Sequence, residues 1–486
     1  MTISQALSAA TSGLSVSSRR AAVVSSNISN ALTPGYSRRE VTSVEKITAG
    51  VGLGVEISGI QRASDPALTA SRRAAVGDSS RDTVIADTQS KLTGLLGGPE
   101  EAFSFFSIID DFEQSLSDLR ETPESTTQQQ NAVVAAQQVT RTFNQIASEA
   151  NQTRFDADSA ISRRVDEVNS ALEQIASLNG EISTSAAAAR DTSALEDQRH
   201  VLIDRVAEII PVREVPQSSG QIHLITNEGV FLLTTEAKQL EFTRSTVIAP
   251  TDSLTNGDLS GLAVEGVDIT PGQGNAFSVG GGEIAAQFAV RDEITVEFTE
   301  QLDGLAADLI DRFSDPTVDP TLTGGAPGLF TDNGAALADP YDAGLAGRIA
   351  VNDAVVPENG GEVWRMRDGI GAAAAGTPGN SAVISSLLDG MRSDRAINAT
   401  GFAVAMSSVD AAAELSSLRA GASLAADTQA ATSTARADGL IDAELEATGV
   451  DTDLELQNLL SIEQSYAASA RVISVIDRML AALLEI

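Results

Sequence analysis

The two ends of the chain carry matching patterns of apolar positions. Apolar or small residues recur every three or four positions near the C-terminus, and the same spacing runs through the first thirty residues. This spacing is typical of a helix that packs lengthwise on another helix. The pattern therefore predicts that the terminal helices pair as a coiled coil. The large residues of the two seams are Ile3, Leu7, Leu14, Val24, Ile28, Leu459, Ile462, Tyr466, Ile473, Ile476, Leu480 and Leu483.

Local signals mark where these terminal helices begin and end. Thr2 with Gln5, and Thr452 with Glu455, fit the capping box, in which two side chains satisfy free N–H groups at a helix start. The first helix is expected to stop before Pro34, which cannot continue a helix. The Pro-Gly pair at this point suits the centre of a type II turn.

The seam of the first helix is thin, and two interpretations of it stay open. Only five large residues lie on it, so its burial offsets little of the entropy cost of ordering thirty residues. One interpretation is that both ends are loose in the monomer and become ordered when many copies bundle. The other is an ordinary helix pair that closes a domain of a single chain.

Helical periodicity dominates the chain between its ends. The longest uninterrupted pattern, from Ser125 to Ala189, predicts a rod of about 90 Å at about 1.5 Å per residue. A helix from about Glu100 is expected to bury Phe103 and Phe106. The predicted helices cover 65–96, 100–123, 125–189, 193–210, 283–313 and, with further breaks, 381–445.

Strand signals are fewer and fall in three places. Alternation from Val51 to Ile57 predicts one arm of a hairpin, and a strand is expected at Arg348–Val356. After Pro211 the pattern changes to a hairpin over 222–233 and further short strands, up to the glycine run that ends at Gly282.

These elements predict a mainly α protein with an inserted β domain and an elongated, nested architecture. The terminal helices enclose a middle domain of long helices, which in turn encloses an outer β insertion, so both chain ends meet at one end of the molecule. The predicted domains are residues 1–40 with 450–486 (terminal coiled coil), 41–210 with 283–314 and 381–449 (helical middle), 211–282 (β insertion), and 315–380 (Asp/Gly/Pro-rich, irregular).

Composition narrows the classes of partner. The net charge of −35 disfavours nucleic acid and anionic membrane surfaces as partners. The chain has no cysteine, which excludes disulfides and thiolate metal sites. Neither a basic, apolar leader nor an apolar run of membrane-spanning length is recognisable, so we expect no cleaved signal peptide and no membrane span.

Candidate chemistry is sparse, and no catalytic, cofactor or metal site is predicted. The two histidines, His200 and His223, have no motif around them. The aspartate-rich segment from Asp315 to Asp339 suggests calcium, yet it lacks the spacing of a calcium loop. We therefore expect its carboxylates to be solvated turn residues.

One segment resembles a known family. Residues 26–38 are similar to the N-terminal signature of bacterial flagellar rod, hook and hook-associated proteins, and the form Thr-Pro-Gly-Tyr-Ser-Arg resembles that of the hook-associated proteins. Stretches 51–62, 195–204, 282–292 and 464–474 agree with this resemblance. The signature residues are Asn27, Asn30, Thr33, Pro34, Gly35, Tyr36, Ser37 and Arg38, which we interpret as a bend that fixes the first helix relative to the next layer.

The resemblance implies a structural role and not an enzyme. It implies export through the flagellar type III apparatus, a ring of about eleven copies at the hook–filament junction, and terminal helices that line a channel. The implied partners are further copies of this chain, the hook protein, a second hook-associated junction protein and an export chaperone. The alternatives are a hook or distal-rod protein and, from a different class, a secreted acidic calcium-binding protein or enzyme.

Overall fold

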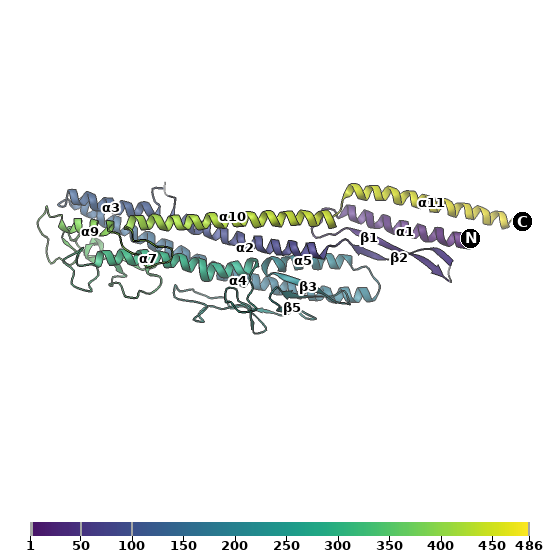
Figure 1. The fold of residues 1–486 in the computed structure, drawn as a ribbon, viewed down its shortest axis with the longest axis horizontal. Coiled ribbons are helices and arrows are strands. Elements are labelled where there is room, and N and C mark those ends of the chain that lie inside the picture. Colours follow the sequence, from purple (N-terminus) through teal and green to yellow (C-terminus); the bar gives the residue numbers. More distant parts are fainter. Residues whose placement is uncertain (1–2, 49–50, 99–100, 485–486) are drawn as a thin grey trace.

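The computed structural model describes residues 3–48, 51–98 and 101–484. The molecule is elongated, and its two chain ends lie side by side at one end of the long axis (Figure 1). The fold is mainly helical with small sheets, which confirms the predicted fold class. No helix among the described residues is both long and apolar enough to cross a membrane.

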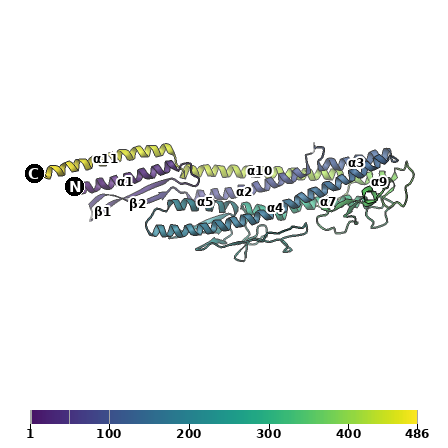
Figure 2. The ribbon, with the colours of Figure 1, turned by 180° about the vertical axis from the view of Figure 1, so that it is seen from behind.

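Two helices and a hairpin form the terminal end. Helix α1 (Ile3–Ser29) lies between α11 (Thr452–Leu484) and the antiparallel hairpin of β1 (Arg39–Thr48) and β2 (Val51–Arg62) (Figures 1 and 2). The predicted helices and the predicted strand are therefore confirmed. Strand β1 was not predicted, because its residues alternate less regularly than those of β2.

Long helices form the rest of the rod. Helix α10 runs beside α2 along the rod, and α4, with 62 residues, is the longest helix (Figure 1). The remaining helices pack around these three. The bounds are α2 (Pro66–Leu96), α3 (Phe105–Glu121), α4 (Thr126–Ala187), α5 (Ser193–Ile209), α6 (Gly282–Ala289), α7 (Thr295–Ser314), α8 (Arg365–Asp368), α9 (Ala382–Arg392) and α10 (Ser408–Thr448).

Short strands form three small antiparallel sheets besides the hairpin. Two of them, β3-β4-β5 and β6-β7-β8, lie in the segment between α5 and α6, and β9 pairs with β10 further along the chain. The bounds are β3 (Val212–Pro216), β4 (Ile222–Thr226), β5 (Phe231–Leu233), β6 (Leu240–Glu241), β7 (Ala263–Val264), β8 (Val267–Asp268), β9 (Phe330–Asp332) and β10 (Ile349–Val351).

The β segment lies along the side of the rod and not at its outer end. Figure 1 shows β3 and β5 beside α4, and β6 also contacts α4. In contrast, α3, α9 and the segment after α7 make up the end opposite the termini (Figures 1 and 2). The inserted β domain predicted from sequence is therefore present, and the structure places it along α4. Helix α4 is long enough to carry two cores, one along each half.

Two hydrophobic cores stabilise the rod. The first joins α3, the first half of α4, α7, α9 and the start of α10. It contains a cluster of three rings, in which Phe330 meets Phe112 and Phe313 edge to face. The second joins the later half of α4, α5, α6 and the β segment. Both cores lie between residues 92 and 415, so neither includes a residue of the terminal helices.

Helix ends and one helix interior differ from the predictions. Ser104 caps α3, so Phe105 is buried, Phe106 is half-buried and Phe103 is 85 % exposed. The predicted helix 283–313 is interrupted by a π-helical turn, η1 (Val290–Ile294). There the hydroxyl of Thr295 donates to the carbonyl of Val290 at 2.7 Å, which widens the turn.

Candidate assembly interface and the joint behind it

Helices α1 and α11 approach each other closely through small residues. The hydroxyl of Ser17 lies 3.5 Å from that of Ser465, and a Cβ added at Gly13 would meet the hydroxyl of Ser469 at 3.3 Å. Residues nearer the N-terminus of α1 thus meet residues nearer the C-terminus of α11, so the two helices are antiparallel. The lengthwise pairing predicted from the two seams is confirmed.

The seam residues lose solvent exposure to different extents. Among them only Val24 and Ile476 are buried, at 7 % and 5 % exposure, and Tyr466 and Leu480 remain 46 % and 40 % exposed. The side chain of Leu483 lies outside the described residues. The half-buried seam residues are Ile3, Leu7, Leu14, Ile28, Leu459, Ile462 and Ile473.

Helix α1 has a second partner that the seam pattern did not predict. The hydroxyl of Ser8 donates to the carbonyl of Leu53, and the amide of Val55 donates to the hydroxyl of Ser12, each at 3.1 Å. Gly54 has φ +115°, and a Cβ there would lie 2.1 Å from the Ser12 hydroxyl. The glycines of β2 therefore allow the hairpin to lie directly against α1.

Asn27, from the family signature, is the hub of the terminal end. Its side chain is fully buried. The side-chain amide donates to the carbonyl of Arg39 and to the carboxylate of Glu455, both at 3.0 Å. The side-chain oxygen accepts from the hydroxyl of Tyr36 at 2.8 Å and from the backbone amide of Arg39 at 3.1 Å. All four hydrogen-bonding positions of the asparagine are thus used. One side chain joins α1, the following turn, β1 and α11.

The other signature residues shape the turn after α1. The side chains of Asn30 and Thr33 donate hydrogen bonds at the end of α1. The backbone amide of Tyr36 donates to the carbonyl of Thr33, which closes the turn over Pro34 and Gly35. Gly35 has φ +77°, as the third position of a type II turn requires. A Cβ there would also lie 2.3 Å from the side chain of Val201 on α5.

Asp197 on α5 connects the terminal end to the rod. Its carboxylate accepts from the guanidinium of Arg39 at 2.6 Å and from that of Arg62 at 2.7 Å, and all three side chains are at most 14 % exposed. Arg62 also donates to the hydroxyl of Ser37 at 3.0 Å. The amide of Arg38 donates to the carbonyl of Thr448 at 2.8 Å, beside the break between α10 and α11. We call the segments 30–39, 62–65 and 448–451, together with Asp197, the joint.

A second charged network lies beside the joint. Arg72 and Arg73 on α2 both donate to Asp204 on α5, at 2.8 and 2.6 Å, and pair with Glu444 on α10 and Glu214 on β3. His200 packs among these arginines. Burial lowers the pKa of His200, against the opposing charge of Asp204, so its ring is neutral at pH 7 and has a structural role.

Some residues of the joint were missed by sequence reasoning. Glu455 was expected to cap α11 in a box with Thr452, but Asp451 caps the helix through the amides of Asp453 and Leu454. Glu455 instead turns to Asn27. The capping box predicted at Thr2 lies outside the described residues. The only early sign of Asp197 was its place within the family-like stretch 195–204.

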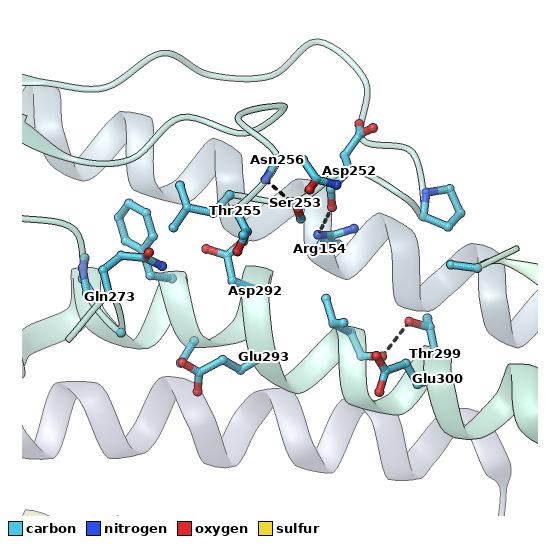
Figure 3. A pocket seen from close by; sticks show the side chains of 18 of the residues that line it. Arg154, Asp252, Ser253, Thr255, Asn256, Gln273, Asp292, Glu293, Thr299 and Glu300 are labelled. Atoms are coloured by element: carbon cyan, nitrogen blue, oxygen red, sulfur yellow. Dashed lines mark hydrogen bonds between the residues drawn. The ribbon is translucent and has the colours of Figure 1, made fainter. Parts of the chain in front are cut away.

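A hollow away from the terminal end is lined mainly by structural contacts. It has a volume of about 700 Å³ and lies between the loops near Pro250 and helices α6 and α7 (Figure 3). Its buried Arg154 donates to the carbonyls of Arg291, Ala249 and Asp252, and burial lowers its pKa. Arg154 thus fastens a loop to α4.

The aspartate-rich segment does not gather metal ligands. Among the described residues, no group of three His, Cys, Asp or Glu side chains is arranged to hold a metal ion. The expectation that its aspartates are all solvated is wrong for Asp319, which is 1 % exposed. Its carboxylate accepts from the amides of Thr321 and Ile370 and holds two loops together.

Comparison with known proteins finds similarity to flagellar hook-associated and rod proteins. The model of the flagellar hook-associated protein FlgK helical domain matches residues 89–318. The model of the flagellar basal body rod FlgEFG protein C-terminal matches residues 443–486, and that of the flagella basal body rod protein matches residues 7–36. Flagellar hook-associated protein 1 of Bacillus subtilis is 23 % identical over 98 % of this chain and 96 % of its own length. The chain is thus similar to a flagellar hook-associated protein 1 over nearly its whole length.

Other relatives match parts of the chain. Flagellar hook-associated protein 1 of Escherichia coli is 29 % identical over 48 % of this chain and 43 % of its own length. The solved structure of the flagellar hook junction protein FlgK from Burkholderia pseudomallei is 20 % identical over 54 % of this chain and 46 % of its own, with a TM-score of 0.44.

Charge is divided unequally along this chain. Residues 1–62 and 452–486 together contain eight Lys or Arg and eight Asp or Glu, so the terminal end is neutral. The whole net charge of −35 therefore lies in residues 63–451. The net negative charge of residues 63–451 makes the rods of two copies repel each other, whereas the neutral terminal ends carry no net charge that would keep them apart.

Glu455 makes the docking of α11 sensitive to pH. Burial raises the pKa of Glu455 above its ordinary value, although the hydrogen bond from Asn27 and the charge of Arg38 act in the opposite direction. The stabilisation that Glu455 contributes to the folded state is therefore complete at a pH below its ordinary pKa of 4.5. It is lost as the pH rises through the raised pKa. We expect amide hydrogen exchange in α11, corrected for intrinsic rates, to show increasing protection as the pH falls from 7.5 towards 5.

The variant Glu455→Gln should remove most of this pH dependence, because a neutral amide still accepts from Asn27. Glu463→Gln, an exposed position on the same helix, is the matched control and should behave as the unaltered chain does. Equal pH dependence of α11 protection in Glu455→Gln and in the unaltered chain would contradict the assignment.

Proposed function

We propose that this chain is a structural protein of the hook–filament junction of the bacterial flagellum, where copies assemble through their terminal ends into a ring. The observation that carries the proposal is the apolar surface that α11 leaves uncovered. Eight of its large apolar residues are 40–60 % exposed: Leu454, Leu456, Leu460, Tyr466, Val472, Val475, Met479 and Leu480. Such a surface marks a contact site, since monomeric proteins rarely leave one uncovered.

The hairpin adds apolar surface on the opposite side of α1. Val44 and Ile47 of β1 are 54 % and 60 % exposed. The terminal end thus has apolar side chains on both flanks, and its net charge is zero. These two properties support a role for the ends in bringing copies together. The proposed number, about eleven copies in one ring, is what the resemblance to flagellar hook-associated proteins implies.

The junction role is favoured over a hook or distal-rod role by the extent of the matches. The rod-protein models match only residues 7–36 and 443–486, whereas the Bacillus subtilis hook-associated protein 1 matches nearly the whole chain. The proposed partners are further copies of this chain, the hook protein, a second hook-associated junction protein, the export chaperone and the type III export apparatus. The proposed location is extracellular, after export without a cleaved signal.

Deletion of the gene tests the proposed role. Cells without this chain should make hooks of normal length and release unassembled filament subunits into the medium, because the filament has no junction on which to grow. Electron microscopy of hooks and immunoblots of the medium measure the two effects. Absence of hooks would indicate a hook or rod protein, and normal filaments would refute the proposal altogether.

A further inference from the structure

Helix α11 carries a second seam besides the one that faces α1. Seven exposed positions follow the spacing 7-4-3-4-3-4, which keeps them on one stripe of a helix: Leu454, Ser461, Ser465, Ala468, Val472, Val475 and Met479. The four large residues of this stripe are 42–50 % exposed. The spacing is that of a helix-packing surface. Ser465 lies at the edge of this stripe, where its hydroxyl reaches Ser17 of α1, and the four large residues of the stripe remain largely uncovered by the described chain.

Helix α1 also has a third, uncovered face. Its exposed positions repeat the same spacing with small residues only: Ser4, Thr11, Ser15, Ser18, Ala22, Ser25 and Ser29. The faces of α1 that meet α11 and the hairpin are separate from this one. Small residues admit a helix at short distance, as Gly13 and Ser17 already do within the molecule.

We propose that the second seam of α11 packs on the free face of α1 of an adjacent copy. The two faces have the same length and spacing, and a stripe with large side chains meets one with small side chains. In a ring whose copies all point the same way, α11 and the neighbouring α1 are antiparallel, as they are within one chain. Antiparallel alignment of the two stripes sets Val472 opposite Thr11 and Met479 opposite Ser4.

Charge supports a second copy as the occupant. Between Ile3 and Ser29 the only charged side chains are Arg19 and Arg20, whereas α11 has four acidic and two basic residues. The helices are therefore of opposite net charge, in a chain whose rods repel one another. The contact joins two different surfaces, so it propagates from copy to copy and closes a ring instead of stopping at a dimer.

The absence of native cysteine permits a direct test in assembled flagella. Cells would produce a mixture of two single-cysteine chains, Thr11→Cys and Val472→Cys, so that a disulfide between the two positions can form only between copies. We expect mild oxidation of isolated hook–filament structures to give a covalent dimer in the mixture and none in flagella made from either chain alone. Ser4→Cys and Ser18→Cys are also used in place of Thr11→Cys, so that a dimer is detected if the two helices are shifted along their axes relative to each other.

Ser474→Cys is the matched control, because Ser474 is exposed close to Val472 on a different face of α11. Absence of a mixed dimer with all three α1 positions, or an equal yield with Ser474→Cys, would overturn the inference. A dimer from Val472→Cys alone would show that α11 meets α11 and would overturn it too. This inference rests on the proposed function, so filament growth is measured in the same cells to distinguish failure of the pairing from failure of the function. Normal filaments without the mixed dimer refute the pairing alone.

A second experiment tests the same contact without cysteine substitutions, so that its result does not depend on whether the cysteine variants assemble. The double variant Val472→Glu, Val475→Glu places charge on the second seam, and we expect at least a tenfold fall in filaments per cell with unchanged thermal unfolding of the purified chain. Ser474→Glu should leave the filament number unaltered. Filament numbers that are equal in the two variants would contradict the proposed contact.

Discussion

Chains that lack residues 1–30 or 456–486 should remain soluble and folded and yet fail to support filament growth. Both hydrophobic cores lie between residues 92 and 415, so neither truncation removes a core side chain. The terminal helices contribute the exposed seams and the neutral surface instead. We expect the thermal midpoint, followed by circular dichroism at 222 nm, to change by no more than a few degrees, while the number of filaments falls to the level of the gene deletion.

A core variant shows that the assay can detect a loss of stability. Phe112 is fully buried in the ring cluster of the first core. Phe112→Ala should lower the free energy of unfolding by about 3–5 kcal/mol. Unfolding of the whole chain by either truncation would mean that the ends are part of the folding core, and the assembly interpretation of both seams would then fail.

The spacing of apolar residues predicted most of the helices, because one face of a helix is made by residues that are only three or four positions apart in the sequence. The rod helix α4 and its buried stripe follow directly from the spacing of residues such as Phe143, Ile161 and Leu172. The exit of α1 at the Pro34-Gly35 turn follows from local chemistry in the same way. Such signals do not depend on what lies across the fold.

Contacts between distant residues could not be predicted from the sequence. Arg39 and Asp197 are 158 positions apart, and Asn27 and Glu455 are 428 apart. No local pattern specifies which carboxylate a given arginine meets. Glu455 was misassigned for this reason: the capping motif is a local signal, and a buried partner from the other end of the chain overrides it.

The position of the β segment along the rod could not be predicted for a related reason. Nesting in the sequence gives the order in which elements enclose one another and not their place along the long axis. Helix α4 turns back into α5 near the terminal end, and the β segment that follows packs on the later half of α4. Its strands have as few as two residues, too short for alternation to show their direction.

Asp197→Asn should loosen the terminal end from the rod while both remain folded. The carboxylate holds two guanidinium groups, and an amide replaces one charged acceptor by a neutral donor and acceptor, removing the carboxylate closest to Arg39 and Arg62. Removing one partner of a buried pair costs about 3–5 kcal/mol. The loss falls on the contact between the two parts, since neither hydrophobic core includes these residues.

Distances between spin labels measure this effect, because the chain has no cysteine of its own. Labels at Ser18→Cys on α1 and Glu181→Cys on α4 report the angle at the joint, and both sites are exposed. We expect a narrow distribution of distances for the unaltered joint and a broad one for Asp197→Asn.

The neighbouring carboxylate provides the control. Glu196 is more exposed, and its oxygen lies 3.9 Å from the Arg62 guanidinium, against 2.7 Å for Asp197. Glu196→Gln should therefore leave the distribution narrow. Equal broadening in the two variants would show that general charge loss and not the Asp197 contact governs the angle. An unchanged distribution in Asp197→Asn would show that the Asn27 hub and the Gly35 turn hold the joint without it.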